Sequence, residues 1–169
     1  MQFFFHIGPH KTGTTALQNY FLDRYGSHAP TAVWYPAPQR LGPGHADIAE
    51  RLLPQHKRGA NPLTDIVETA SAAGTSSLII SSENFSAFPQ CLDDYKAALD
   101  GHPVTLVSTQ NSLIHRAASR WQEWVKGGTH KAFEKSLDRI LASPGFQVDL
   151  IERYASHLGA KDRDNLHIS

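Results

Sequence analysis

Two glycines, a lysine and three threonines follow the first apolar run of the chain, and together they could bind an anion. The stretch reads Gly-Pro-His-Lys-Thr-Gly-Thr-Thr over residues 8–15. A glycine, four residues and a second glycine, followed by hydroxyl residues that open a helix, has the spacing of a phosphate-binding loop. The glycines let backbone N–H groups turn toward an anion, and the helix N-terminus adds the positive end of its dipole.

The position of the lysine separates this loop from that of the nucleoside triphosphatases. In those proteins lysine directly follows the second glycine, where this chain has Thr14, whereas Lys11 comes two residues before Gly13. An ammonium at that place could stabilise charge that develops on a leaving phosphate. The alternative is a simple glycine turn in which Thr12 or Thr14 caps a helix.

Residues 6–18, His-Ile-Gly-Pro-His-Lys-Thr-Gly-Thr-Thr-Ala-Leu-Gln, resemble the 5′-phosphosulfate loop of the sulfotransferases, particularly the bacterial and carbohydrate-type branch. That family moves a sulfuryl group from 3′-phosphoadenosine 5′-phosphosulfate (PAPS) to a hydroxyl or amine. The resemblance covers residues 2–128 and implies a P-loop-type α/β fold and chemistry without a metal. It also implies that the 5′-phosphosulfate is held by Lys11, Thr12, Gly13, Thr14 and Thr15.

That family has a second phosphate-binding motif, called the second anchor below. It binds the 3′-phosphate with an arginine at a strand end and a serine eight residues later. In this chain Ser119 matches the serine, but the residue eight positions earlier is Asn111, which lacks the charge and fork of arginine. Arg116, one helical turn before Ser119, could supply the charge or could pair with Glu123 on a solvated face. We therefore expect weaker PAPS binding than in a typical relative.

Sulfuryl transfer to an alcohol requires a base for the acceptor proton, usually a glutamate or a histidine. Glu83 follows a buried strand and should emerge at the carboxyl end of the sheet, where ligands bind in open α/β folds. The surrounding Ser-Ser-Glu-Asn-Phe also resembles bacterial sulfotransferases. His45, which opens a helix after a Pro/Gly-rich loop, is the second candidate, and His10 could touch acceptor or phosphate. Helix capping by Glu83 and a structural role for His45 are the alternatives.

Apolar runs and helical periodicity predict the elements that must position these side chains. Buried strands are expected at residues 3–7, 77–82 and 104–108, residues 31–35 could form a further strand, and another begins at 166–169. Helices are expected from Thr14, with a stripe of Leu17, Tyr20 and Phe21, and over residues 45–53, 62–73, 92–99, 112–126, 132–141 and 147–158. Strands that alternate with helices predict an α/β fold: a three-layer parallel sheet with helices on both faces.

Composition limits the possible functions. The 169 residues make about one domain, 1–169, which would lack the C-terminal part of roughly a hundred residues usual in the family. Sixteen basic and sixteen acidic residues cancel, so we expect no nucleic-acid partner. The single cysteine and the scattered histidines argue against a metal site. The chain has neither an apolar run of about 20 residues nor a secretory signal, so the expected location is cytoplasmic, without a membrane span.

Three functions remain open from the sequence. The first is a PAPS-dependent sulfotransferase that acts on a small-molecule or carbohydrate acceptor. The second is a P-loop kinase or NTPase, in which residues 78–83 are a strand that ends in a magnesium-directing acid. The third is a catalytically impaired nucleotide-binding module, which Asn111 and the short C-terminus favour. A homodimer through an open sheet edge is a further expectation.

Overall fold

The computed structural model describes residues 1–8, 12–38, 42–56, 59–109, 112–128, 132–142 and 150–160, and the backbone of residues 162–166. Its strands are β1 (Gln2–His6), β2 (Gly26–Ser27), β3 (Val33–Pro36), β4 (Ser77–Ser81), β5 (Val104–Thr109) and β6 (Asp162–Leu166). They lie in the order β2-β3-β4-β1-β5-β6, and every neighbouring pair is parallel. The predicted α/β class with a parallel sheet is confirmed.

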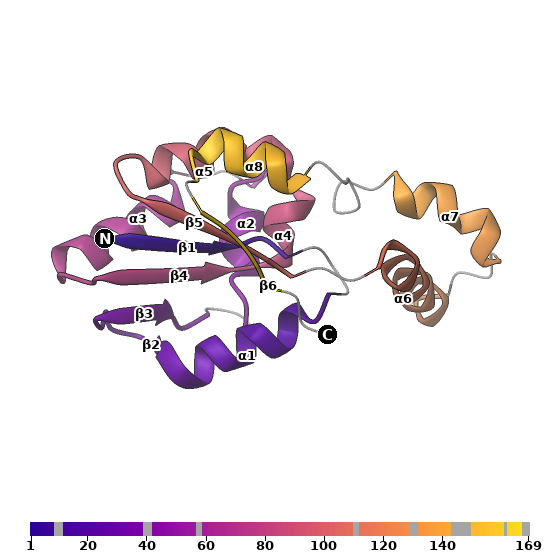
Figure 1. The fold of residues 1–169 in the computed structure, drawn as a ribbon, viewed down its shortest axis with the longest axis horizontal. Helices are drawn as coiled ribbons and strands as arrows, with labels where there is room; N and C mark the ends of the chain where they lie inside the picture. Colours follow the sequence, from indigo (N-terminus) through magenta and orange to yellow (C-terminus); the bar gives the residue numbers. More distant parts are fainter. Residues whose placement is uncertain are drawn as a thin grey trace.

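Helices cover both faces of this sheet (Figure 1). They are α1 (Thr14–Tyr25), α2 (Ala46–Arg51), α3 (Pro62–Ala72), α4 (Glu83–Ala87), the short 3₁₀ helix η1 (Pro89–Cys91), α5 (Leu92–Leu99), α6 (Leu113–Lys126), α7 (Phe133–Leu141) and α8 (Leu150–Leu158). From β1 the chain moves outward to β3, then back to β4 and across β1 to β5. Right-handed crossovers in opposite directions place α1 on one face and α3, α5 and α8 on the other.

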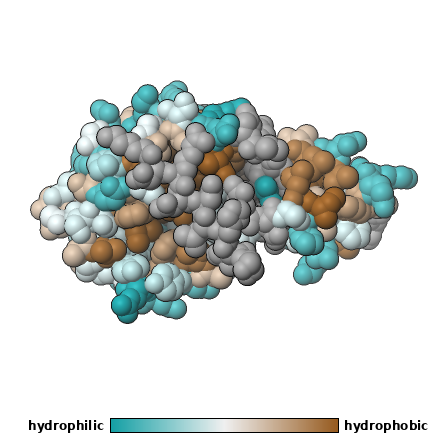
Figure 2. Space-filling model, viewed as in Figure 1, coloured by the Kyte–Doolittle hydropathy of each residue, from teal (hydrophilic) through white to brown (hydrophobic). Residues whose placement is uncertain are grey.

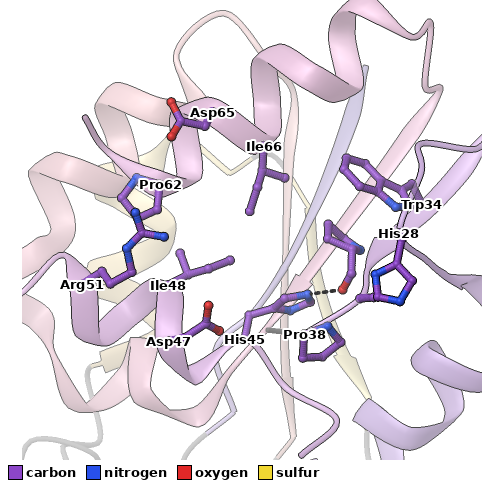
Figure 3. A pocket seen from close by; sticks show the side chains of 12 residues that line it. His28, Trp34, Pro38, His45, Asp47, Ile48, Arg51, Pro62, Asp65 and Ile66 are labelled. Atoms are coloured by element: carbon purple, nitrogen blue, oxygen red, sulfur yellow. Dashed lines mark hydrogen bonds between the residues drawn. The ribbon is translucent and has the colours of Figure 1, made fainter. Parts of the chain in front are cut away.

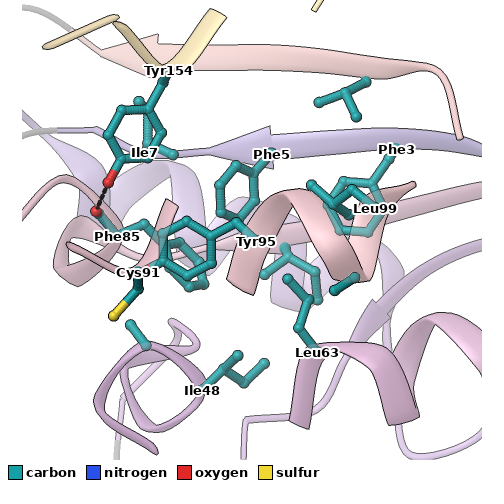
Figure 4. Packing of buried hydrophobic residues seen from close by; sticks show 14 of the residues in the cluster. Phe3, Phe5, Ile7, Ile48, Leu63, Phe85, Cys91, Tyr95, Leu99 and Tyr154 are labelled. Carbon is teal, nitrogen blue, oxygen red and sulfur yellow. Dashed lines mark hydrogen bonds between the residues drawn. The ribbon is translucent and has the colours of Figure 1, made fainter. Parts of the chain in front are cut away.

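The main core lies between the sheet and the α3–α5–α8 layer. Phe3, Phe5 and Ile7 are fully buried, because alternate residues of β1 point to this side. The ring of Phe5 packs against Phe85, with centroids 4.6 Å apart, and against Tyr95 at 5.5 Å (Figure 4). The aromatic cluster therefore joins the central strand to α4 and α5.

Helices α6 and α7 pack mainly against each other and lie beside the carboxyl end of the sheet (Figure 1). Ala117 of α6 and Ile140 of α7 are buried at their contact, with Trp121 and Trp124 partly buried beside them. Ile114 remains 61% exposed, and Figure 2 shows apolar atoms gathered over α6. The sequence predicted a helix over residues 112–126, but not that part of its apolar face would be exposed to solvent.

The buried face of α1 also differs from its prediction. Tyr20, expected in the apolar stripe, is 56% exposed, whereas the polar side chains of Thr14 and Gln18 are buried. The reason is that the first turns of α1 lie against polar groups at the end of the sheet rather than against the apolar core. The prediction was therefore wrong for Tyr20 and missed Thr14 and Gln18, whereas Leu17 and Phe21 of the predicted stripe are half-buried.

Replacement of Phe5 by alanine should lower the free energy of unfolding by about 3–5 kcal/mol, because it leaves a cavity among fully packed rings. Urea denaturation followed by far-UV circular dichroism measures the change. Ile114→Ala is the matched control at an exposed site and should cost under about 0.5 kcal/mol. Equal losses for the two variants would contradict the described core.

Candidate functional site

The carboxyl ends of β1, β4 and β5 meet at one edge of the sheet. His6 at the end of β1 is in register with Ser81 of β4 and Val107 of β5. After β1 the chain first adds strands on one flank of β1, at β3 and β4, and later on the other flank, at β5. The strand order therefore reverses at β1. In open parallel sheets this edge is where ligands bind.

Two glycines shape the described part of the loop between β1 and α1. A methyl group added at Gly8 would lie 2.6 Å from both His6 Nε2 and Thr109 Oγ1, so only glycine fits this close approach. Gly13 has a φ of 82°, in the left-handed region that favours glycine, and it directly precedes α1. Because Gly13 is the N-cap and has no side chain, the first N–H groups of α1 need an acceptor from elsewhere.

Glu83 lies against the first two turns of α1. Thr14 Oγ1 donates to Glu83 Oε2 at 3.1 Å, and Gln18 Nε2 donates to the same oxygen at 3.3 Å. Thr14 and Gln18 are four residues apart and share one face of the helix. Glu83 is the first residue of α4, which Ser82 caps by accepting from Asn84 N at 3.1 Å. The structure thus brings together two predicted site residues, Thr14 and Glu83, from segments 69 residues apart.

The other loop threonines have different surroundings. Thr12 is buried, and its Oγ1 shares a hydrogen bond of 2.6 Å with Thr109 Oγ1 at the end of β5. Thr15 is exposed on α1. His10, Lys11 and Asn111 lie outside the described residues, so their predicted roles stay predictions.

His45 is buried with both ring nitrogens bound to backbone groups. Ser81 N donates to His45 Nδ1 at 3.1 Å, so the proton must be on Nε2, which donates to Pro36 O at 2.7 Å. Burial lowers the pKa of His45, against the opposing effects of Pro36 and Asp47. This geometry favours a neutral ring that joins β3 to β4, and the role of a catalytic base stays a prediction.

His6 is the second buried imidazole at this edge. Its Nδ1 shares a hydrogen bond of 2.6 Å with Ser81 Oγ, whereas its Nε2 has no hydrogen-bond partner in the described part of the chain. Burial lowers the pKa of His6 to about 4, although the charge of Glu83 acts in the opposite direction. His6 is therefore neutral near pH 7.

The predicted second anchor lies on α6. Arg116 and Ser119 are both half-buried on the helix that follows β5, at the same end of the sheet as the loop. Burial lowers the pKa of the Arg116 guanidinium, which still keeps its charge. Arg120, on the next turn, forms an ion pair with Glu123 at 3.2 Å.

Sequence reasoning missed two residues that shape this edge. Gln18 orients Glu83, and its amide lies so close to Gly44 that a methyl group there would approach to 2.7 Å. Tyr35 packs its ring on His45, with centroids 4.4 Å apart, and donates its hydroxyl to Pro43 O at 2.5 Å. Gln18 had a usable signal, because it lies one turn after Thr14 on a face that carries polar residues.

Comparisons of the chain with protein-family models, with curated proteins and with solved structures give no match. None of the helices in the described ranges is both long and apolar enough to cross a membrane. The same part of the chain holds no cluster of three histidine, cysteine or acidic side chains with the spacing of metal ligands. The loop motif and the geometry of this edge are therefore the features of the chain that bear on its function.

The stability of the protein should fall as the pH drops from about 6.5 toward 4. In this range the unfolded chain takes up a proton at residue 6, while buried His6, with its lowered pKa, does not. The difference corresponds to about 2–3 kcal/mol lost between about pH 7 and pH 4.5. His45 contributes in the same direction. Urea denaturation at the two pH values measures the loss.

His6→Asn removes this titration and should reduce the pH dependence by about that amount. His56→Asn, at an exposed histidine, is the control and should keep the dependence of the natural protein. If His6→Asn and the natural protein lost the same free energy on acidification, the buried neutral state of His6 would be disproved.

Proposed function

We propose that the protein is a PAPS-dependent sulfotransferase that transfers a sulfuryl group to a hydroxyl or amine. This proposal rests mainly on the sequence and geometry at the start of α1. A loop with the family's Lys-Thr-Gly-Thr-Thr sequence leads from the central strand through left-handed Gly13 into a helix without a side-chain cap. The carboxylate of Glu83 lies against the first turn of that helix.

The residues of this loop fit an anionic donor. Gly8 leaves room that a side chain would fill, and the N-terminus of α1 offers N–H groups and a positive dipole end. Thr12 and Thr14 add hydroxyls, and Lys11 adds the positive charge that stabilises a leaving phosphate. PAPS, when bound, supplies an activated sulfuryl group. In this assignment the residues that hold its 5′-phosphosulfate are Lys11, Thr12, Gly13, Thr14 and Thr15.

Glu83 takes the role of the general base in this proposal. Thr14 and Gln18 donate to its Oε2 and so fix the carboxylate beside the loop. A carboxylate held in place can remove the proton of an acceptor hydroxyl as the new bond forms. His45 acts less directly, because its ring holds the ends of β3 and β4 and thereby the strand that leads to Glu83.

A kinase or NTPase is the second candidate, because a specific contact favours it. Glu83 follows the apolar strand beside β1 and meets a threonine hydroxyl, a combination that holds magnesium in P-loop enzymes. The sequence positions argue against it. Thr14 occupies the place of the NTPase lysine, and Thr15, at the place of the magnesium-binding hydroxyl, is exposed while Glu83 contacts Thr14.

PAPS should raise the melting temperature of the protein, whereas ATP with magnesium should not, since a ligand stabilises only the state that binds it. A thermal-shift titration measures both ligands. Lys11→Ala should weaken PAPS binding at least about tenfold by loss of a charged contact. Lys96→Ala, at an exposed lysine of α5, is the control and should bind like the natural protein.

The same titration with an analogue that lacks the 3′-phosphate tests the second anchor. Affinity equal to that of PAPS would show that Arg116 and Ser119 make no contact with the 3′-phosphate. Stabilisation by ATP that requires magnesium, together with ATP hydrolysis, would reject the sulfotransferase in favour of the second candidate. Tight PAPS binding without turnover on any acceptor would indicate a noncatalytic module.

Glu83→Gln should lower the turnover of PAPS by about a hundredfold or more, because it removes the base, while PAPS binding stays within a few-fold. Glutamine keeps the acceptor oxygen for Thr14 and Gln18. Release of 3′-phosphoadenosine 5′-phosphate measures turnover, and Glu68→Gln, on an exposed turn of α3, is the matched control. Unchanged turnover in Glu83→Gln would remove this residue from the mechanism.

A further inference from the structure

A cavity of about 280 Å³ lies between the carboxyl end of β3 and the helices α2 and α3 (Figure 3). Its walls include the apolar side chains of Trp34, Ile48 and Ile66. Neither Glu83 nor any described residue of the loop 8–15 lines it, whereas His45, which joins β3 to β4, forms part of its wall.

Asp47 is the feature of this cavity that the fold does not explain. The residue is only 6% exposed, and its Oδ1 is buried without a hydrogen-bond partner in the described part of the chain. Figure 3 shows its carboxylate turned toward the open space between His45 and Ile48. Burying a carboxylate without a donor or a positive charge beside it is unfavourable.

The neighbouring basic side chains do not neutralise Asp47. Arg51 lies four residues later on the same helix, the usual spacing of a helical ion pair, yet it is exposed and no ion pair joins it to Asp47 in the described structure. The ring of His45 is neutral, and Pro36 and Ser81 occupy both of its nitrogens. Arg51 and His28 also line the cavity, but in the described part of the chain no basic side chain forms an ion pair with Asp47, whose Oδ1 therefore faces the cavity without a donor.

We propose that this cavity binds a small organic ammonium ion, whose N–H group donates to Asp47 and whose apolar part lies against Trp34, Ile48 and Ile66. The ammonium supplies both the positive charge and the donor that Oδ1 lacks. The volume of about 280 Å³ is slightly below the roughly 300–1,000 Å³ of ligand pockets, so the ligand is small. A metal ion fits less well, because no group of three metal-ligating side chains gathers in the described residues.

A titration with 2-phenylethylamine tests this site, with 2-phenylethanol as the uncharged control of the same shape. The indole N–H of Trp34, which donates to Ser27 O at 2.9 Å, is a local probe of the cavity wall by ¹H–¹⁵N NMR. We expect saturable shifts of this resonance with the amine at millimolar concentrations and at least about tenfold weaker binding of the alcohol. Equal affinities, or no saturable shift with the amine, would overturn the proposal.

Asp47→Asn removes the charge and nearly keeps the shape, and it should weaken binding of the amine at least about tenfold. Asp65→Asn, at an exposed carboxylate of the rim, is the matched control and should change the affinity less than about threefold. Binding that is unaffected by Asp47→Asn would reject the site. If that variant fails to fold, the comparison of amine with alcohol on the natural protein still decides the question. No experiment here contains PAPS, so failure of the sulfotransferase proposal leaves this test unchanged.

Discussion

The imidazole of His45 holds the carboxyl edge of the sheet together. Its Nδ1 accepts from the backbone of Ser81 in β4, and its Nε2 donates to the carbonyl of Pro36 in β3. The backbone N–H of His45 also donates to Ser81 O at 2.7 Å, so α2 begins fixed to the end of β4. These bonds require a neutral ring, which burial favours. The direction in which the chain continues from Ser81 to Glu83 depends on this arrangement.

The two faces of the sheet are covered in different ways, one mainly by apolar packing and the other by polar contacts. On the face of α3, α5 and α8, aromatic side chains of β1 pack into a mainly apolar cluster, in which the hydroxyl of Tyr154 donates to Phe85 O. On the face of α1, His6, Ser81 and Thr109 end their strands with polar groups, and these must find partners away from water. Helix α1 therefore buries Thr14 and Gln18, and its position depends on hydrogen bonds to Glu83 as well as on packing of Phe21 against Tyr35.

Features that depend on neighbouring residues could be predicted from the sequence. The apolar runs placed β1, β4 and β5 to within two residues at each end, and the helical periodicity of residues 62–73 predicted α3. The rule that parallel strands end at one edge also predicted that Glu83 would lie near the glycine loop. Helix α4 and strand β2 were missed, because segments of five and two residues carry too little periodicity to be detected. The last strand was expected to begin at residue 166, but β6 ends there, because its polar sequence gives no apolar run.

Features that depend on distant partners could not be predicted. The bonds of His45 reach Ser81, 36 positions away, and that of Gln18 reaches Glu83, 65 positions away. Nothing in the local sequence of Asp47 indicates that Arg51, at ideal helical spacing, would point elsewhere. A buried polar residue is satisfied or unsatisfied only through the tertiary arrangement around it.

The charge at the two candidate sites is a further feature that composition alone could not predict. The chain as a whole is neutral, with sixteen basic and sixteen acidic residues, and this balance excludes only partners that respond to the total field. At each of the two sites the local charges do not cancel, and the excess charge is positive at one site and negative at the other. The start of α1 presents N–H groups and a positive dipole end, while Asp47 presents a buried negative charge to a cavity. Because electrostatic interactions in a partly buried site are screened far less than those in water, the local charge, and not the net charge, decides which class of ligand each candidate site suits.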